Sequence, residues 1–456
     1  MELERVFHRI DETFDRTVAE LTAFCAQPSI SAQGIGMQEM AALVAARFRD
    51  LGADVLPHGF DSGYPVIFAR LAGQSPRRLL FYNHYDVQPP DPLDQWRSPP
   101  FQPEVRDGFF YARGAADNKG SLVARLAALR AFREVTGGLP VSVGYVVEGE
   151  EEVGSPHLVA FVDAHRAALT GDGLIWEGAS ADQQGNPVLR LGNKGTLHVE
   201  LRATGPSSDA HARFGGIFPN PIWKIVWALG LVRGPDGRVR LPGFYDSVVP
   251  PSPAEDALYD RLGADAGPLL GRYGLKASFP PRPAREMMVE LYARPTCTLT
   301  GIGGGYQGPG GKTIVPSAAF AKLEFKLVPE QNPDTLLEAL RAHLVAEGCD
   351  VEVQLLSRGY PSKTPLDHQF ADLVRVTGER VYGRPFTIEP TSSGTGPRYA
   401  FTRWSSIPVV AVGGAHAGSM IHGPNENIQL EELRLHTKHV AALMHAMAGG
   451  VDASRT

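Results

Sequence analysis

The stretch LLFYNHYD, residues 79–86, contains the two features that decide the fold class. Its first half, residues 79–82, is a short apolar run of the kind that forms a strand buried on both faces. Its second half turns polar, with Asn83, His84 and Asp86. Ligands bind outside the carboxyl ends of the strands in open parallel sheets, so a polar cluster at such an end indicates a functional site.

Helical and strand-like stretches alternate on both sides of this segment, up to about residue 194. We expect helices and strands in this part from their hydrophobic periodicity. The helices are predicted at 37–51, 119–135 and 158–168, and the strands at 141–147 and 173–176. The same pattern returns near the end of the chain, with helices at 369–382 and 430–447 and a strand at 407–412.

A different pattern occupies the middle of the chain. Half-exposed strands, in which apolar and polar residues alternate, are expected at 196–203, 319–328 and 350–356, with helices at 221–232 and 335–347. A stretch rich in proline and glycine, residues 234–312, separates its two halves. The sequence therefore predicts an α/β domain with a mostly parallel sheet and helices on both faces, interrupted by an inserted α+β domain. We predict the α/β domain in two parts, at 1–194 and 363–456, and the inserted domain at 195–362.

Composition narrows the class of protein. The 456 residues suggest two or three domains. With 44 basic and 50 acidic residues the net charge is −6, which offers no general cationic surface for nucleic acid. No run of 18 apolar residues suits a membrane span, and the charged N-terminus lacks the apolar run of a signal peptide. The three cysteines are too few and too far apart for a disulfide framework, so we expect a cytoplasmic protein without membrane contact.

Polar clusters follow the other predicted strands as well. Glu148–Glu152 follows the strand at 141–147, Glu177 follows the strand at 173–176, and His422 lies beyond the strand at 407–412. Asp117 stands just before a predicted helix. Because parallel strands end at the same edge of a sheet, these side chains can converge on one site.

Histidines and carboxylates in such a cluster indicate a metal centre. The set suits Zn²⁺, Mn²⁺ or Co²⁺, and the absence of cysteine argues against a closed structural zinc site. Five ligands with one bridging carboxylate would hold two cations about 3.5–4 Å apart, which acidify a shared water and polarise a carbonyl. A further carboxylate beside them could move the proton to a leaving amine.

The motifs, taken together, resemble the M20 metallopeptidase family over nearly the whole chain. The resemblance rests on His84-Tyr85-Asp86, residues 114–120 (GAADNKG), residues 151–155 (EEVGS), Glu177 and His422. Within that family the carnosinase-like dipeptidases are the most similar branch, through residues 209–211 (DAH), 243–246 (GFYD), 312–316 (KTIVP) and 422–426 (HGPNE).

The resemblance implies a role for each residue. His84 and Glu177 would hold one divalent cation, Glu152 and His422 a second, and Asp117 would bridge them; zinc is expected first, with manganese and cobalt as alternatives. Asp86 would orient His84, and Glu151 would be the general base and acid. The resemblance also implies a cis peptide bond after Asp117. It further implies a ferredoxin-like inserted domain that acts as lid and dimer interface, from which His211 stabilises the oxyanion in the partner subunit.

Two stretches depart from the branch. Residues 325–329 (FKLVP) place Lys326 where the branch has arginine, which keeps the charge for a substrate carboxylate but loses the bidentate fork. Residues 391–397 (TSSGTGP) replace a charged motif with hydroxyl groups. We therefore expect substrate contacts from a set that includes His211, Lys326, Arg398, Ser393, Gly394 and Thr395.

The predicted function is hydrolysis of the amide bond of dipeptides or similar small peptides at a dinuclear metal centre. The altered stretches leave a second hypothesis open, hydrolysis of N-acyl amino acids or another small amide. A third is a binding protein without catalytic activity on the same scaffold. For individual residues plainer interpretations also stand: Glu148 and Glu150 are expected to be solvated, and His211 could cap a turn.

Overall fold

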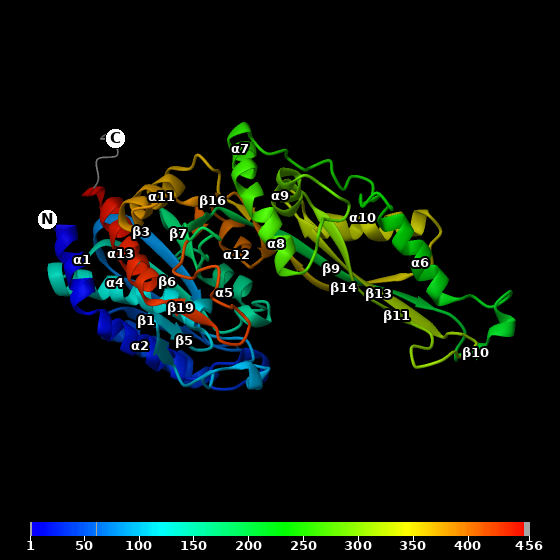
Figure 1. Ribbon diagram of the computed structural model, residues 1–456, viewed down its shortest axis with the longest axis horizontal. Coiled ribbons are helices and arrows are strands. Elements are labelled where there is room, and N and C mark those ends of the chain that lie inside the picture. Colours follow the sequence, from blue (N-terminus) through cyan, green and yellow to red (C-terminus); the bar gives the residue numbers. More distant parts are fainter. Residues whose placement is uncertain (1, 61, 451–456) are drawn as a thin grey trace. The chain divides into compact units, whose positions relative to one another are not determined.

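The computed structural model describes residues 2–60 and 62–450, which form two compact units (Figure 1). The first unit comprises the described parts of Met1–Gly192, Thr364–Pro390 and Ala400–Thr456. The second comprises Asn193–Lys363 and Thr391–Tyr399. Among the described residues, no helix is both long and apolar enough to cross a membrane.

An eight-stranded sheet forms the centre of the first unit. Its strand order is β1 (Asp54–His58), β2 (Val66–Leu71), β6 (Leu139–Glu148), β3 (Gly73–His84), β7 (Gly173–Trp176), β18 (Val409–Ala411), β8 (Val188–Arg190) and β16 (Thr387–Glu389). The four central strands, from β6 to β18, are parallel to one another, and β2 and β8 adjoin them in the antiparallel direction. The predicted mostly parallel sheet is therefore confirmed.

The two faces of this sheet carry separate cores because side chains alternate along each strand. On β3, Leu79 and Phe81 join one apolar cluster, whereas Leu80 and Tyr82 join the other. The first cluster is covered by α1 (Glu2–Glu12), α2 (Phe14–Ala26), α3 (Met37–Asp50), α4 (Gly120–Thr136), α11 (Gln369–Tyr382) and α13 (Leu430–His445). The second is covered by α5 (Leu158–His165) and α12 (Tyr399–Thr402). Helices thus pack on both faces, as predicted.

The second unit is built on a mainly antiparallel sheet. Its main strands are β11 (Thr296–Gly304), β13 (Ala318–Leu327), β9 (Gly192–Thr204) and β14 (Glu352–Gly359), in that order. Two helices, α6 (Pro221–Val232) and α10 (Pro333–Ala346), share an apolar cluster with this sheet. Asn220 and Asn332 cap the two helices with their side-chain oxygens, each just before a proline in the first turn.

Three features of the second unit were not expected from the sequence, the first being that β11 lies within the proline- and glycine-rich stretch. The proline- and glycine-rich stretch contains three helices, α7 (Pro253–Leu262), α8 (Ala266–Arg272) and α9 (Ala284–Ala293), which share a small apolar cluster. Ser252 and Glu255 form a capping box at the start of α7, a local signal that the sequence does contain. In addition, Thr391–Tyr399 belongs to this unit because β17 (Ser392–Thr395) pairs with β9.

Candidate metal centre

Five side chains from remote parts of the chain meet in the first unit. His84 ends β3, Glu177 follows β7, and Glu152 lies in the short turn η4 (Glu151–Val153) after β6. Asp117 lies in the turn η3 (Ala115–Lys119) that precedes α4, and His422 lies between β18 and β19 (Asn427–Gln429). The convergence expected from parallel strand ends is therefore present in the structure.

The two oxygens of Asp117 face two different imidazoles. Asp117 Oδ1 lies 3.0 Å from His84 Nε2, and Asp117 Oδ2 lies 3.2 Å from His422 Nε2. Each imidazole has a further carboxylate neighbour, with Glu177 Oε2 at 3.6 Å from His84 Nε2 and Glu152 Oε2 at 3.3 Å from His422 Nε2. This places Asp117 between two pairs, each of one histidine and one glutamate.

The donor atoms fit divalent cations. In two groups, His84 with Glu151 and Glu177 and His84 with Asp117 and Glu152, the ligand atoms lie within 4.8 Å of one another. Glu177 Oε2 is buried and accepts no hydrogen bond from the described residues, so this carboxylate oxygen is available for a cation. Imidazole nitrogens and carboxylate oxygens are the ligands that zinc and its borderline neighbours take.

The charges of the centre shift the pKa values of its members. Hydrogen bonds with Asp117 and Glu152 raise the pKa of His422 to about 10. Burial alone would raise the pKa of Asp117, but the hydrogen bonds with His422 and His84 hold it below its usual range. Protonated imidazoles thus compensate the negative charge of Asp117, and bound cations would compensate that charge instead.

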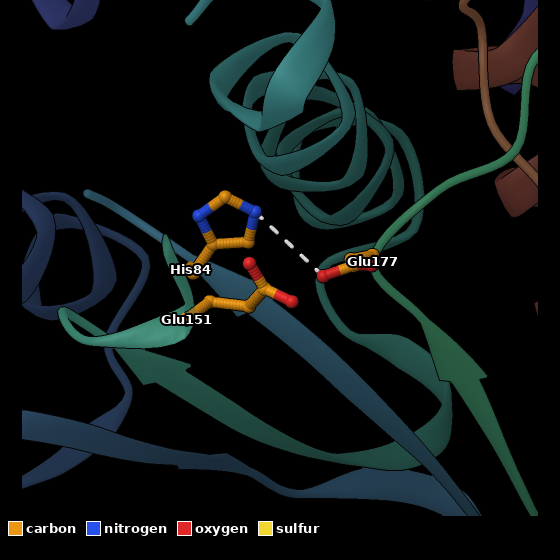
Figure 2. A group of neighbouring side chains, drawn as sticks. All are labelled: His84, Glu151 and Glu177. Atoms are coloured by element: carbon orange, nitrogen blue, oxygen red, sulfur yellow. Dashed lines mark ion pairs between the residues drawn. The ribbon is translucent and has the colours of Figure 1, made fainter. Parts of the chain in front are cut away.

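Glu151 lies beside the same cluster. Figure 2 shows its carboxylate, and that of Glu177, directed toward His84. Burial, followed by the nearby charge of Glu177, raises the pKa of Glu151 well above its usual value. The geometry alone is compatible with Glu151 as a ligand or as a proton carrier.

Asp86 ties His84 to the turn that carries both glutamates. His84 Nδ1 lies 3.0 Å from the Asp86 carbonyl oxygen and 3.3 Å from its Oδ1. The backbone N–H groups of Glu151 and Glu152 donate to the same carboxylate, at 3.3 and 3.0 Å. Because Nδ1 is engaged in this way, Nε2 is left to face Asp117.

Glu426, which the sequence offered only as part of a motif, joins two of the candidate ligands. Its Oε1 accepts from the N–H groups of Ala116 and Asp117, both at 2.9 Å. Its Oε2 accepts from the Gly114 N–H at 2.8 Å and from Arg113 at 2.7 Å. The same guanidinium donates to the carbonyl of His422 at 3.3 Å. One buried ion pair thus holds the backbone of both Asp117 and His422.

Arg125 is a second positioning residue that the sequence did not reveal. It lies fully buried in α4 and donates to the carbonyls of Tyr82 at 2.9 Å, Trp176 at 2.7 Å and Glu177 at 3.0 Å. It also donates to the side-chain oxygen of Asn83 at 2.6 Å. A lone arginine on an otherwise apolar helix face is the only sequence signal of this role, which is to join the ends of β3 and β7.

The expectation that Glu148 and Glu150 are solvated was wrong. Both are buried, Glu148 as the last residue of β6 and Glu150 directly before η4. Glu148 accepts hydrogen bonds from Tyr82 and, at 2.8 Å, from Ser155, and burial raises its pKa to about 8. Glu150 pairs with His157 at 2.6 Å. Glu148 and Glu150 are therefore buried residues that fix the segment carrying Glu151 and Glu152.

The residues expected to contact substrate all belong to the second unit. His211 lies in β10 (Ala210–His211), is exposed, and accepts a hydrogen bond from the Arg213 N–H at 3.1 Å, so the plainer turn-capping interpretation describes its observed contact. Lys326 lies in β13, and Arg398 is buried. Ser393, Gly394 and Thr395 lie in β17. Their roles toward substrate stay predictions.

A mostly parallel sheet with histidines and carboxylates at its carboxyl end, together with a separate α+β unit, is the arrangement that we expected for a metallopeptidase. The Asp117–Asn118 peptide bond is cis, as the resemblance implied. The model of peptidase family M20/M25/M40 matches residues 80–446, and the chain belongs to this family.

Similar proteins agree with this assignment. The Cys-Gly metallodipeptidase dug1 of Schizosaccharomyces pombe is 28% identical over 98% of this chain and 99% of its own length. The Beta-Ala-His dipeptidase of Mus musculus is 30% identical over 75% of this chain and 74% of its own. Among solved structures, the M20 family metallo-carboxypeptidase Sso-CP2 from Sulfolobus solfataricus has a TM-score of 0.89 at 34% identity, covering 95% of this chain and 99% of that one. The chain is thus a peptidase, as the sequence predicted.

Proposed function

We propose that this peptidase hydrolyses dipeptides at a dinuclear metal centre held by His84, Glu177, Asp117, Glu152 and His422. The observation that carries the proposal is the arrangement around Asp117, whose two oxygens face two imidazoles at 3.0 and 3.2 Å. A carboxylate shared in this way suits two cations better than one, because each oxygen has its own histidine and glutamate partner. Zinc is the first candidate, with manganese and cobalt as alternatives.

The similar proteins support the substrate class. The names of the fission-yeast and mouse relatives describe dipeptidases, and that of the Sulfolobus structure describes a carboxypeptidase. All three names concern small peptides or the carboxyl end of a peptide. A dipeptide offers an amide bond directly beside a free carboxylate, so it fits both descriptions.

In the proposed mechanism, cations held by these five side chains would supply Lewis acidity toward water and the amide carbonyl. Glu151 takes the proton from the attacking water and returns it to the leaving amine. Asp86 holds the Glu151 backbone and the His84 ring in position through the hydrogen bonds described above. The role of His211 of a partner subunit as oxyanion donor remains a prediction. It requires a homodimer, which is also a prediction and which light scattering can test.

The decisive variant is Glu151→Gln, which keeps the shape of the side chain and removes its capacity to take a proton. We expect kcat on dipeptides such as Ala-Leu to fall about 10²–10⁴-fold. Metal content, measured by elemental analysis, should stay unchanged. Glu39→Gln, on the exposed face of α3, is the matched control and should retain full activity.

Two results would overturn parts of the proposal. A variant with near wild-type kcat excludes Glu151 as the proton carrier, and a variant that has lost a cation makes Glu151 a ligand. Including N-acyl amino acids in the substrate panel tests the second hypothesis, since their preferential hydrolysis would replace the dipeptidase function with deacylation.

A further inference from the structure

A pocket of about 520 Å³ lies among helices α2, α3 and α4 of the first unit, of which α2 and α4 are labelled in Figure 1. Two small side chains of α2, Ala19 and Ala23, line it and leave room for a ligand. Its volume is within the range of small-ligand sites. None of the described residues that line it is a candidate metal ligand, so this pocket is separate from the metal centre.

Charged side chains form most of the lining of this pocket. Four guanidinium groups and three carboxylates contribute, namely Arg16, Arg47, Arg130 and Arg133 together with Glu20, Asp50 and Glu134. The formal charge of the lining is therefore +1. Such a lining suits an anion better than a cation or an apolar molecule.

Two of the three carboxylates are shared between arginines. The buried Glu20 lies 2.6 Å from Arg130 and 3.4 Å from Arg47. Glu134 lies 3.0 Å from Arg16 and also pairs with an arginine of α1. A guanidinium has five N–H donors, so a shared carboxylate with two oxygens leaves donors of each arginine available to a ligand.

Arg133 has no carboxylate partner among the described residues. Its guanidinium donates to the carbonyl oxygen of Leu51 and lies against Gly52, where an added Cβ would be 2.7 Å from a guanidinium nitrogen. Gly52 has a φ of +68°, which glycine adopts without strain. The turn after α3 thus holds the positive charge of Arg133 at the pocket, where the remaining donors are available to an anion.

The third carboxylate can be replaced by a ligand at low cost. Asp50 is exposed and pairs with Arg47 at 3.3 Å, one turn earlier in the same helix. Exposed ion pairs of this kind contribute about 0.2–1 kcal/mol, because water screens both charges. An anion that binds beside Arg47 therefore has to compete with Asp50 only weakly.

We propose that this pocket binds a small polyanion that carries phosphate or carboxylate groups, with Arg133 and Arg47 among its donors. Guanidinium groups bind both kinds of oxyanion through paired N–H donors. Several such groups on packed helices favour a ligand with more than one negative charge. The inference goes beyond the proposed function, since this ligand would be bound in addition to the peptide substrate.

Calorimetry with inorganic pyrophosphate and with citrate tests the two kinds of anion. Both anions chelate cations, so the titrations use the full chain after removal of its metals. We expect saturable binding at one site per chain. Arg133→Gln should weaken this binding about tenfold, because it removes charged hydrogen bonds to the anion. The control Arg380→Gln, an exposed arginine of α11, should leave the Kd unchanged.

Two further variants should change the affinity in opposite directions. Asp50→Asn removes the competing carboxylate and should strengthen binding about two- to fivefold. Ala23→Glu places a carboxylate at an exposed position that lines the pocket and should abolish binding. Circular dichroism checks that each variant is folded, and the exposed positions of Asp50 and Ala23 make unfolding an improbable cause of either change.

The outcomes decide the inference without reference to catalysis. Binding of either anion that Arg133→Gln weakens and Asp50→Asn strengthens supports it, and the anion that binds identifies phosphate or carboxylate as the recognised group. Failure of both anions to bind the wild-type protein overturns it. Binding with the same Kd in the wild type and in Arg133→Gln also overturns it, since the anion is then held elsewhere on the chain.

Discussion

The exchange Glu426→Gln tests whether a single buried ion pair holds two candidate metal ligands in place. Glu426 is 1% exposed and accepts hydrogen bonds on both oxygens, two from backbone N–H groups on Oε1 and two, including that of Arg113, on Oε2. A glutamine has one oxygen and one NH₂ group. Whichever way it is placed, its NH₂ group faces two donors, and the Arg113 charge loses its partner.

The expected cost follows from these contacts. Breaking one side of a buried ion pair costs about 3–5 kcal/mol, because the remaining charge stays buried without compensation. In one orientation of the glutamine the Asp117 N–H loses its acceptor, and in the other orientation the Gly114 N–H loses its acceptor. Exchange of a residue that supports a metal ligand typically lowers metal affinity about 10–100-fold, so we expect metal affinity to fall by that factor here.

Two assays check the prediction. Thermal unfolding of the metal-free protein should show a clearly lower midpoint, and competition with a chromogenic chelator should show weaker zinc binding. Glu431→Gln, an exposed residue in the first turn of α13, is the control and should change stability by less than about 0.5 kcal/mol. Unchanged zinc affinity in Glu426→Gln would refute the idea that this ion pair positions Asp117 and His422.

Two further predictions concern the centre and the core. His422→Ala should lose one of two bound cations per chain while keeping the other, and elemental analysis that finds both retained would contradict its role as a ligand. Burial lowers the pKa of His439 to about 4, from 6.5, so below pH 6.5 the unfolded chain binds a proton that the folded chain does not. This part of the stability is unaffected above pH 6.5 and falls by up to about 1.4 kcal/mol per unit down to pH 4. In His439→Gln, which can still donate to the Val374 carbonyl, urea melts should show a weaker acid dependence, and an identical dependence would exclude His439 as its source.

The elements that local sequence patterns did predict lie close to their observed bounds. The periodicity of residues 369–382 matches α11, and the apolar run at 173–176 matches β7. Both patterns reflect burial of one face or of a whole short strand, which a window of a few residues records. The helices α7 to α9 escaped prediction because glycine and proline masked short helices whose apolar contacts are few.

Hydrogen bonds between distant residues were harder to predict. Glu426 lies more than 300 positions from the turn that it holds, and Arg125 connects strands on either side of it in the sequence. A charged residue in a helix or loop most often faces solvent, so nothing local marks Glu426 as buried, and only the apolar helix face around Arg125 marks that residue. The same reasoning misplaced Glu148 and Glu150, whose partners Tyr82 and His157 become neighbours only in the folded chain.

The sequence by itself determined the alternation of strands and helices, the polar residues at the strand ends and the order of motifs that marks an M20 peptidase. The tertiary structure alone decided which oxygens of Asp117 face which histidine, which carboxylates are buried, and that Lys326 pairs with Glu324. The physical reason is that periodicity and motif are properties of neighbouring residues, whereas burial and charge pairing depend on segments that meet only after folding.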